Sequence, residues 1–573
     1  MGRGRRGSRR SGGGQDSKQA QRSAERLESY REFIDDWDAF AEAIRRPEPA
    51  TLRANTVRIT RDRLAARLAD QGFEVSPVAH QPAFLRVDAE PEGRSVSDTL
   101  EHWLGLFYMQ QTATGWAAPL LAPEPGDRVL DLCSAPGGKT THLAELLGGR
   151  GVVVASDVNE SRIRALLGNV YRLGHTNIMT VAGDGRRFPL GATFDRVMVD
   201  VPCSAEGTLR KRGGRLPGQS GKWAKQVAKA QEKLLRRALE LTRPGGTLLY
   251  VTCTFGPQEN EAVLTRVLAD ADLSVEPLEL PVPHAPGLSG FRDDVYDPSL
   301  AGAVRLYPHH LDSGGLFLCR LRKGEGEGEV ESAPAGGTPS GQSGPGSRPP
   351  LVGWTPVPAS FPDSLEGGED LVGSEDLVGS ENPEGSENLE GRDGLPGAQD
   401  GGVPAGSGPG RETDPAMRAD LGRAFPFLDA QIGVPADLLG PLSWLRRGTN
   451  LWAHTLDAWP LRAWKPGGHW RVVAVGFRAF DLGGDGPPRP TNDLLGWLAD
   501  RVPRRMELSA TQWLSLLAER SLPHAGPDGM VALAHGGTVL ARGYRRDGVL
   551  RHEVPKGRRR WLASVMEGRR DAG

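Results

Sequence analysis

The sequence predicts an α/β fold whose central part is a doubly wound parallel sheet. Apolar runs typical of buried strands alternate there with helical stretches of roughly ten to fifteen residues, which is the pattern of such sheets. The runs read RVLDLC, GVVVASD, FDRVMVD and GTLLYVTC. A glycine-rich turn follows the first run and opens a helix, as in nucleotide-binding βαβ units. With 573 residues, 76 glycines and 45 prolines, the chain is expected to hold several domains and linker sequence besides this sheet.

Composition divides the chain into segments. Residues 1–26 are rich in Arg, Gly and Ser and are expected to form a disordered basic arm. Residues 27–100 open with one amphipathic helical pattern and continue as short αβ units, which predicts a small N-terminal α/β domain that is expected to bind RNA. Residues 101–322 hold the sheet. Residues 323–415 carry eighteen acidic and four basic side chains with four near-copies of the hexamer EDLVGS, and they are expected to be a disordered acidic linker.

Residues 416–573 return to a globular composition and hold eight of the thirteen tryptophans. They end in the strand-like pair GMVALAHGGTVLARGYRR and the basic stretch HEVPKGRRRW. Aromatic side chains between Arg and Lys can stack bases and hold phosphates, although a single tryptophan is more often core material. Without the acidic linker the chain is basic and has basic ends, which slightly favours a polyanion partner over a merely solvated basic surface.

Several classes of protein are excluded by what the sequence lacks. No run approaches the roughly eighteen apolar residues of a membrane span, and no apolar segment follows the basic N-terminus, so neither a membrane anchor nor a secretory signal is expected. We therefore expect a cytoplasmic protein. The four cysteines form no CxxC pair, which argues against a disulfide framework and against a structural zinc site. No metal is expected, and any role of the thiols is expected to be chemical.

The turn after the first strand predicts a nucleotide-type cofactor. It reads DLCSAPGGKT, and the next strand ends in Asp157, twenty residues after Gly137, where an acidic residue typically accepts ribose hydroxyls. The pattern PGGK is neither G-x-G-x-x-G nor a P-loop, which favours a cofactor with adenosine but no phosphate. Asp184 follows the third strand, where its carboxylate could accept a hydrogen bond from an adenine amine.

Two cysteines lie at the ends of the next strands. The fourth strand ends at Asp200 and runs into Cys203, and the fifth ends at Cys253. The carboxyl ends of parallel strands meet at one edge, where doubly wound folds bind ligands. One free cysteine is usually a small buried hydrophobe, but two thiols converging on a polar cleft favour nucleophilic chemistry. The remaining two, Cys133 and Cys319, are expected to pack.

These segments resemble the Sun/NOL/NOP family of S-adenosylmethionine-dependent RNA cytosine-5 methyltransferases. The motifs DLCSAPGGKT, GDGR, DVPCSAEGTLRK, RPGGTLLYVTCTFGPQENE and GGLFLCRLRK occur in the family's order and approximate spacing, and LRANTVRI is similar to its RxNT segment. The resemblance covers about residues 27–322 and implies a Rossmann-like methyltransferase sheet, S-adenosyl-L-methionine as the cofactor and RNA as the partner.

The resemblance also implies roles for individual residues. Cytosine C5 is too electron-poor to take a methyl group unaided, so covalent catalysis is required. Cys253 would add to C6, Asp200 would assist at the N3 edge, and Cys203 would help remove the C5 proton and release the enzyme. Lys139 is placed among both the catalytic and the cofactor-binding residues. The cofactor-binding residues implied are Cys133, Ser134, Ala135, Pro136, Gly137, Gly138, Lys139, Asp157, Arg162, Asp184 and Asp200, with Arg210 as a further candidate for cofactor or RNA contacts.

The C-terminal end narrows the expected substrate. It resembles the PUA-like segment of bacterial small-subunit ribosomal RNA methyltransferases, which implies ribosomal RNA or the small ribosomal subunit as partner. Three alternatives stay open: a tRNA cytosine-5 methyltransferase, a methyltransferase acting on an exocyclic amine or a protein side chain, and a non-catalytic RNA-binding factor of ribosome assembly. Amine methylation needs no covalent adduct and typically has a [DN]PP[YF] loop in place of DVPCS, so the paired cysteines argue against it.

Overall fold

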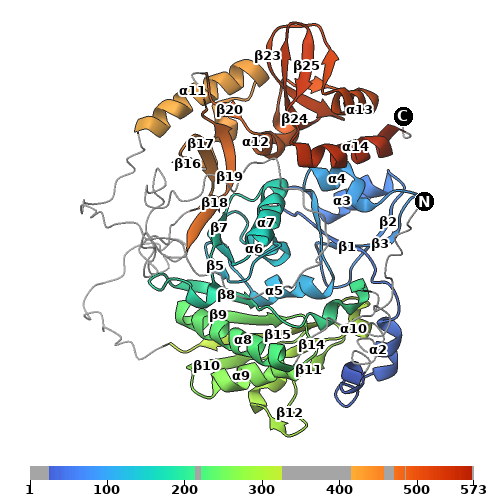
Figure 1. Cartoon of the computed structure of the whole chain (residues 1–573), viewed down its shortest axis with the longest axis vertical. Coiled ribbons are helices and arrows are strands. Elements are labelled where there is room, and N and C mark those ends of the chain that lie inside the picture. Colours follow the sequence, from blue (N-terminus) through green and yellow to red (C-terminus); the bar gives the residue numbers. More distant parts are fainter. Residues whose placement is uncertain (1–24, 213–220, 326–414, 457–469, 484–485, 571–573) are drawn as a thin grey trace, which may run out of the picture.

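The computed structural model describes residues 25–212, 221–325, 415–456, 470–483 and 486–570 (Figure 1). Nearly all of the predicted basic arm and of the predicted acidic linker lies outside these residues. Among the described helices, none is both long enough and apolar enough to cross a membrane.

The N-terminal part begins with two short helical segments, so the single amphipathic helix predicted from residue 27 is wrong. Residues 25–28 form one turn, and α2 (Trp37–Ala43) starts anew. The cause is Asp36, whose carboxylate accepts the Ala39 N–H at 3.0 Å and caps the second helix. The apolar spacing was nevertheless informative, since Tyr30 and Phe40 are both buried.

A four-stranded antiparallel sheet follows, with the order β2-β3-β1-β4. Helix α3 (Arg61–Ala69) packs on it through Leu64 and Leu68, which are both fully buried. Because β4 lies beyond residue 100, this sheet crosses the boundary expected there. Its strands are β1 (Thr51–Ala54), β2 (Glu74–Pro77), β3 (Phe84–Ala89) and β4 (Phe107–Met109), and α4 (Leu100–Trp103) precedes β4.

The central sheet confirms the predicted doubly wound architecture. Five parallel strands run in the order β7-β6-β5-β8-β9, and antiparallel strands continue from β9 through β15 and β14 to β11. The parallel strands are β5 (Arg128–Asp131), β6 (Val152–Asp157), β7 (Ile178–Ala182), β8 (Phe194–Asp200) and β9 (Thr242–Thr252). The antiparallel ones are β10 (Leu273–Glu276), β11 (Ala285–Pro286), β14 (Val304–Leu306) and β15 (Leu316–Lys323).

Helices cover both faces of this sheet. Contacts join α5 to α6 and α6 to α7, whereas α8 contacts α9, as expected when the chain winds outward from β5 in both directions. Strands β6 and β7 are buried along their whole length because both faces of the sheet are covered. The helices are α5 (Ala117–Leu121), α6 (Gly138–Leu146), α7 (Glu160–Leu173), α8 (Gly221–Leu241) and α9 (Glu261–Leu268).

The C-terminal region contains two small sheets with helices beside them. The predicted strand pair is confirmed as β23 and β24, which pair antiparallel across a turn at Gly536 and Gly537, both with positive φ. The first sheet has β16 (Ser443–Arg447), β17 (Asn450–His454), β19 (Phe477–Asp481) and β20 (Arg489–Pro490). The second has β21 (Met506–Glu507), β22 (Ser521–Pro523), β23 (Gly529–His535), β24 (Thr538–Arg546) and β25 (Val549–His552). The helices are α11 (Pro415–Ile432), α12 (Asn492–Leu498), α13 (Ala510–Glu519) and α14 (Lys556–Arg570).

One strand of the C-terminal region joins the central sheet. Strand β18 (Arg471–Val475) pairs antiparallel with β7. The central sheet therefore receives its edge strand from residues beyond the predicted linker (Figure 1). The boundary expected at residue 416 is therefore not a structural separation.

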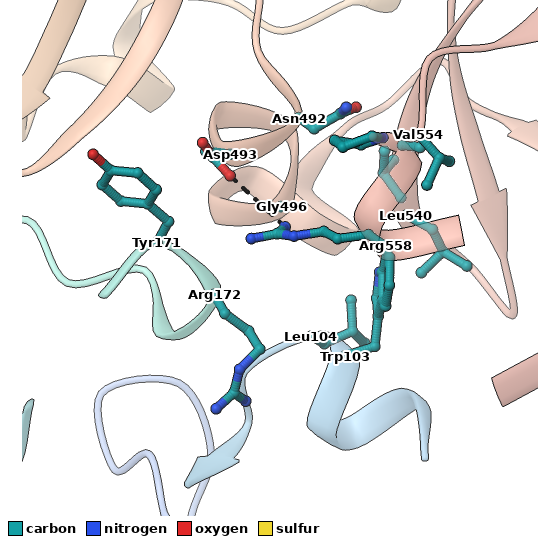
Figure 2. A pocket seen from close by; sticks show the side chains of 13 residues that line it. Trp103, Leu104, Tyr171, Arg172, Asn492, Asp493, Gly496, Leu540, Val554 and Arg558 are labelled. Atoms are coloured by element: carbon teal, nitrogen blue, oxygen red, sulfur yellow. Dashed lines mark ion pairs between the residues drawn. The ribbon is translucent and has the colours of Figure 1, made fainter. Parts of the chain in front are cut away.

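A small cavity marks where the three parts of the chain meet. Its volume is about 30 Å³, and it lies between α4, α7, α12, β24 and α14 (Figure 2). Burial raises the pKa of Asp493, whose carboxylate lies 3.9 Å from Arg558. The cavity has room for water but not for a nucleotide, and neither of the paired cysteines lines it.

Candidate active site

The carboxyl ends of the parallel strands bring the predicted residues to one edge. Asp131 ends β5, Asp157 ends β6, and Asp200 ends β8, while Cys253 directly follows β9. The loop from Cys203 comes back to the same point. The sequence therefore predicted this convergence correctly.

The two thiols are in direct contact. The sulfur of Cys203 lies 3.4 Å from that of Cys253, and both side chains are partly buried. The hydrogen bond from Cys203 lowers the pKa of Cys253, an effect that burial opposes. The same hydrogen bond, followed by burial, raises the pKa of Cys203 well above its usual value. The pair thus favours ionisation of Cys253 over ionisation of Cys203.

Neighbouring charges act on both thiols. The carboxylate of Asp200 raises the pKa of Cys253, and the ammonium of Lys139 lowers it by less. The carboxylate of Glu259 raises the pKa of both thiols. Lys139 Nζ donates to Asp200 Oδ2 at 2.7 Å. Burial lowers the pKa of Lys139, but Asp200 outweighs burial and the net shift is upward. The lowered pKa of Cys253 therefore comes mainly from the hydrogen bond with Cys203, and the Lys139 ammonium adds to it.

Two buried glutamates hold the thiol loops, and the sequence analysis missed both. Glu259 accepts the Ser204 N–H at 2.9 Å and so fixes the loop of Cys203. Glu206 accepts the Thr254 hydroxyl at 2.9 Å and the Phe255 N–H at 3.1 Å, which fixes the segment after Cys253. Both glutamates lie inside motifs that the sequence already singled out, AEG and QEN. Only the fold reveals which loop each glutamate holds.

The N-terminal segment contributes to the same support. The Tyr30 hydroxyl donates to Glu206 at 3.1 Å, and Arg26 forms an ion pair with that carboxylate. Arg26 was expected to belong to the disordered arm, but it lies among the described residues and takes part in this contact. The paired-thiol site is therefore braced by residues nearly two hundred positions away in the sequence.

The predicted cofactor loop forms a tight cradle. Ser134 donates its N–H and its hydroxyl to the Ser156 carbonyl, at 2.9 and 3.0 Å, which ties the loop to β6. Gly137 has φ of 108°, and a Cβ there would lie 2.7 Å from Leu166 Cδ1. Thr140 donates to one oxygen of Asp131 at 2.7 Å, while the other oxygen is buried without a hydrogen-bond partner. Burial raises the pKa of Asp131 to about 7.

The structure places the remaining predicted cofactor residues around this cradle. Asp157 is buried and accepts the N–H of Ala135 at 3.2 Å and that of Asn159 at 2.9 Å. Arg162 donates to the Ala135 carbonyl and lies 3.5 Å from Asp157. Asp184 forms a bidentate pair with Arg186 in the turn after β7, with the shortest contact at 2.7 Å.

The cradle fits the adenosine and amino-acid parts of S-adenosylmethionine. A carboxylate accepts about four hydrogen bonds, so Asp157 retains capacity for ribose hydroxyls beyond the two it accepts. Val158, next to it, is 65% exposed and offers apolar surface to a flat ring. The unpartnered oxygen of Asp131 is a second polar group available to such a cofactor.

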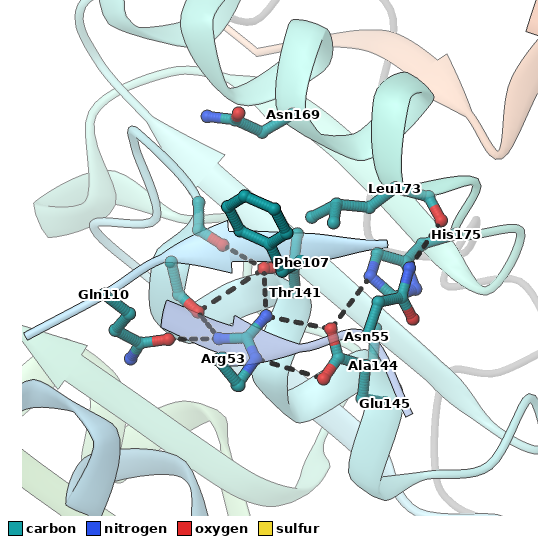
Figure 3. A network of polar contacts seen from close by, with 12 residues as sticks. Arg53, Asn55, Phe107, Gln110, Thr141, Ala144, Glu145, Asn169, Leu173 and His175 are labelled. Carbon is teal, nitrogen blue, oxygen red and sulfur yellow. Dashed lines mark hydrogen bonds and ion pairs between the residues drawn. The ribbon is translucent and has the colours of Figure 1, made fainter. Parts of the chain in front are cut away.

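Two arginines from the predicted motifs, Arg210 and Arg53 of the RxNT segment, hold the fold together through buried hydrogen bonds. Arg210 is buried and donates to the carbonyls of Arg46 and Pro47, so its expected role in cofactor or RNA contacts is wrong. In the RxNT segment, Arg53 is buried and donates to both oxygens of Glu145 on α6, at 3.0 and 2.9 Å (Figure 3).

One cluster of possible metal-ligating side chains occurs among the described residues, formed by Asp35, His309 and His310. The Tyr307 N–H donates to His310 Nδ1 at 3.2 Å. The proton of this imidazole is therefore on Nε2, which donates to Asp35 at 2.9 Å. A metal ligand needs a free lone pair on Nε2, so the contacts are those of a hydrogen-bonded cluster.

The thiol pair predicts a measurable reactivity. Iodoacetamide is expected to alkylate Cys253 first, and Cys203→Ala is expected to slow that reaction at pH 7 roughly tenfold, because a hydrogen bond to a charged group contributes about 1.5 kcal/mol or more. Peptide mass spectrometry over time gives the rate. Cys319→Ala is the matched control, because Cys319 is buried in β15. Equal rates in Cys203→Ala and the wild type would contradict the assigned donor.

Comparison with known proteins yields family matches in two segments. Residues 118–322 match the family described as 16S rRNA methyltransferase RsmB/F, and residues 28–92 match the ferredoxin-like domain of RsmF/B-like methyltransferases. The second match agrees with the predicted small N-terminal α/β domain.

Individual relatives cover the same half of the chain. A human 28S rRNA (cytosine(4447)-C(5))-methyltransferase is 33% identical over 50% of this chain and 35% of its own length. A ribosomal RNA small subunit methyltransferase F from Salmonella agona is 34% identical over 55% of this chain and 64% of its own length. The chain thus covers less than two thirds of either relative.

Solved structures from Pyrococcus horikoshii are also similar. A methyltransferase homolog is 32% identical and covers 50% of this chain and 90% of its own, with a TM-score of 0.45. NSun6 with SFG is 24% identical and covers 52% of this chain and 97% of its own, with a TM-score of 0.45.

Proposed function

We propose, from the matches of residues 28–92 and 118–322 to the RsmB/F family models, that this protein transfers a methyl group from S-adenosyl-L-methionine to C5 of cytosine in ribosomal RNA. The observation that carries the proposal is the contact between Cys203 and Cys253 at the ligand-binding edge of the sheet. Two thiols with opposite pKa shifts suit a reaction in which one adds to a base and the other handles a proton.

The first step is the addition of the Cys253 thiolate to C6 of cytosine. A bond forms between sulfur and C6, and the electron pair of the C5–C6 double bond is displaced toward N3, where Asp200 assists. Lys139 holds Asp200 in place through its 2.7 Å hydrogen bond. The ring becomes an enamine that is nucleophilic at C5. S-Adenosylmethionine, when bound, supplies an electrophilic methyl group for that carbon.

The second step removes the C5 proton. The hydrogen bond with Cys253 is the largest cause of the raised pKa of Cys203. Once Cys253 is bonded to carbon it is no longer an anion, so this contribution ends and Cys203 ionises more easily. Cys203 releases its proton to solvent, its thiolate takes the proton from C5, the C5–C6 double bond re-forms, and Cys253 leaves as thiolate. Formation of the adduct thus prepares the base that resolves it.

RNA contacts are proposed for the C-terminal region, but not through its tryptophans. All six described ones there are buried or partly buried, as expected of core side chains. The exposed aromatic residue is Tyr544 on β24, which is 47% exposed and pairs across the sheet with the exposed Arg551. An aromatic face flanked by arginines can stack a base and hold its phosphates. We place this binding in the cytoplasm, as part of the same proposal.

The test measures which atom is methylated. RNA carrying tritium at cytosine C5 is incubated with the protein and S-adenosylmethionine, using small-subunit rRNA, large-subunit rRNA and tRNA in parallel. We expect one tritium released for each methyl group incorporated, because C5 methylation replaces that hydrogen, and we expect small-subunit rRNA to react fastest. Methylation without tritium release would contradict C5 chemistry and indicate an amine or protein acceptor. Preferential reaction of tRNA would contradict ribosomal RNA as the substrate but not cytosine C5 as the methylated atom.

A further inference from the structure

The C-terminal region supplies more than the edge strand of the central sheet. Beyond the ladder of β18 and β7, the Gly476 N–H donates to the Ile178 carbonyl at 2.8 Å, and the Thr455 N–H donates to that of Thr176 at 3.0 Å. Arg471 forms a 2.8 Å ion pair with Glu160 at the start of α7. The strand β7 is therefore held along its whole length by residues of the C-terminal region.

Trp470, the residue before β18, lies just beyond the end of β7. Arg471 pairs with Ala182, so Trp470 comes opposite Gly183, the first residue after the strand. A Cβ built on Gly183 would lie 2.5 Å from two atoms of the Trp470 ring. The indole also packs against Phe188, with ring centroids 4.9 Å apart. Gly183 is therefore glycine because the indole occupies the space of a side chain.

Gly183 links the two acidic residues proposed for adenosine. Its N–H donates at 3.0 Å to the carbonyl of Asp157, the predicted ribose ligand. The next residue is Asp184, the predicted partner of the adenine amine, whose carboxylate caps the following turn by accepting the Arg186 N–H at 3.0 Å. The position of Gly183 consequently fixes the spacing of the two carboxylates.

We propose that Trp470 is a positioning residue for the adenosine half of the cofactor site, acting through Gly183 on Asp157 and Asp184. The inference rests on the proposed function in that it takes this edge to be the cofactor site. It assigns part of that site to the C-terminal region, which neither matched family segment includes. Cofactor binding then depends on a chain segment nearly three hundred residues from the acidic residues it positions.

The test uses the full chain and S-adenosylhomocysteine, whose binding requires neither RNA nor methyl transfer. Isothermal titration is expected to give a Kd about tenfold or more weaker for Trp470→Ala and within about threefold of the wild type for Trp470→Phe, which retains an aromatic face; tenfold corresponds to ~1.4 kcal/mol. In steady-state methylation, Trp470→Ala is expected to raise the KM for S-adenosylmethionine and to leave kcat nearly unchanged.

Trp444→Ala is the matched control. Trp444 lies in the same region and packs against Phe425 and Phe480, away from β7, so its truncation reports any general loss of packing. Equal weakening by the two alanine variants, or unchanged binding by Trp470→Ala, would overturn the inference. If the wild type binds no S-adenosylhomocysteine, the proposed function fails together with the inference. If it binds but methylates no RNA, only the proposed function fails.

A coupling experiment tests the contact itself. Gly183→Ala alone is expected to weaken S-adenosylhomocysteine binding, since its methyl group meets the indole. In the Trp470→Ala background the same change is expected to add little, because the space is then open. Fully additive effects would contradict the proposed route through Gly183.

Discussion

Cys203→Ala is expected to trap a covalent protein–RNA complex that Cys253→Ala cannot form. The Cys253 thiolate still adds to C6 in the first variant, more slowly because its hydrogen-bond donor is gone, but the C5 proton has no base and elimination stalls. The second variant lacks the nucleophile altogether. A denaturing gel with labelled RNA and S-adenosylmethionine measures the adduct, and 5-methylcytosine analysis of the released RNA measures turnover.

The expected loss of turnover exceeds a thousandfold in both variants. When residues act as one catalytic unit, removing any one of them lowers activity about as much as removing all of them. Cys319→Ala serves as a control, because Cys319 is fully buried in β15, outside the proposed catalytic and cofactor-binding residues. An adduct formed by Cys253→Ala, or turnover surviving in it, would show that the nucleophile is a different residue.

Arg53→Ala is expected to lower the free energy of unfolding by roughly 3–5 kcal/mol, as is typical when one partner of a buried ion pair is removed. Arg53 is fully buried and donates to Glu145, to Thr141 and to the Gly138 carbonyl, so the change leaves the buried Glu145 carboxylate without its arginine partner (Figure 3). Urea denaturation followed by circular dichroism measures the loss. Arg86→Ala, which removes a more exposed pair with Asp88, is expected to cost less than about 1 kcal/mol.

The sign of the pH dependence gives an independent check. Burial raises the pKa of Glu145, but Arg53 and His175 outweigh it and bring the pKa to about 2, below the ordinary 4.5. A carboxyl whose pKa is lowered in the folded state stabilises the fold above its unfolded pKa, and this contribution is lost as pH falls from about 4.5 to about 2. Arg53→Ala should reverse the effect and become relatively less destabilising in acid. If Arg53→Ala lowered the free energy of unfolding by the same amount at every pH, the assigned role of Glu145 would be contradicted.

Residue patterns predicted the central sheet well because its strands are covered on both faces. Each strand is then built around a buried, mostly apolar core, as in β6 and β7, and the chemistry follows at its carboxyl end. The first helix was predicted less well. Its apolar spacing continues through Asp36, but a capping carboxylate restarts the helix there, and periodicity does not register a cap.

The sequence predicted the residues of the candidate site that take part in the reaction. It did not predict the residues that hold those residues in place. Cys203 and Cys253 are recognisable because thiols are rare in this chain. Glu206, Arg53 and Trp470 act by touching segments distant in sequence, and such contacts depend on how domains pack. For the same reason Arg210 was misassigned: a basic residue within a catalytic motif looks available until its hydrogen-bond partners are known.

The pairing of β18 with β7 has a consequence for biosynthesis. About 290 residues separate Ala182 from its partner Arg471, and at roughly 5–20 residues per second a ribosome needs on the order of 15–60 s to make them. Throughout that interval β7, whose five residues are all buried in the finished protein, presents the unpaired backbone groups of an open sheet edge, a template for aggregation. Pairing with β18 therefore closes this edge only after the C-terminal region has been synthesised.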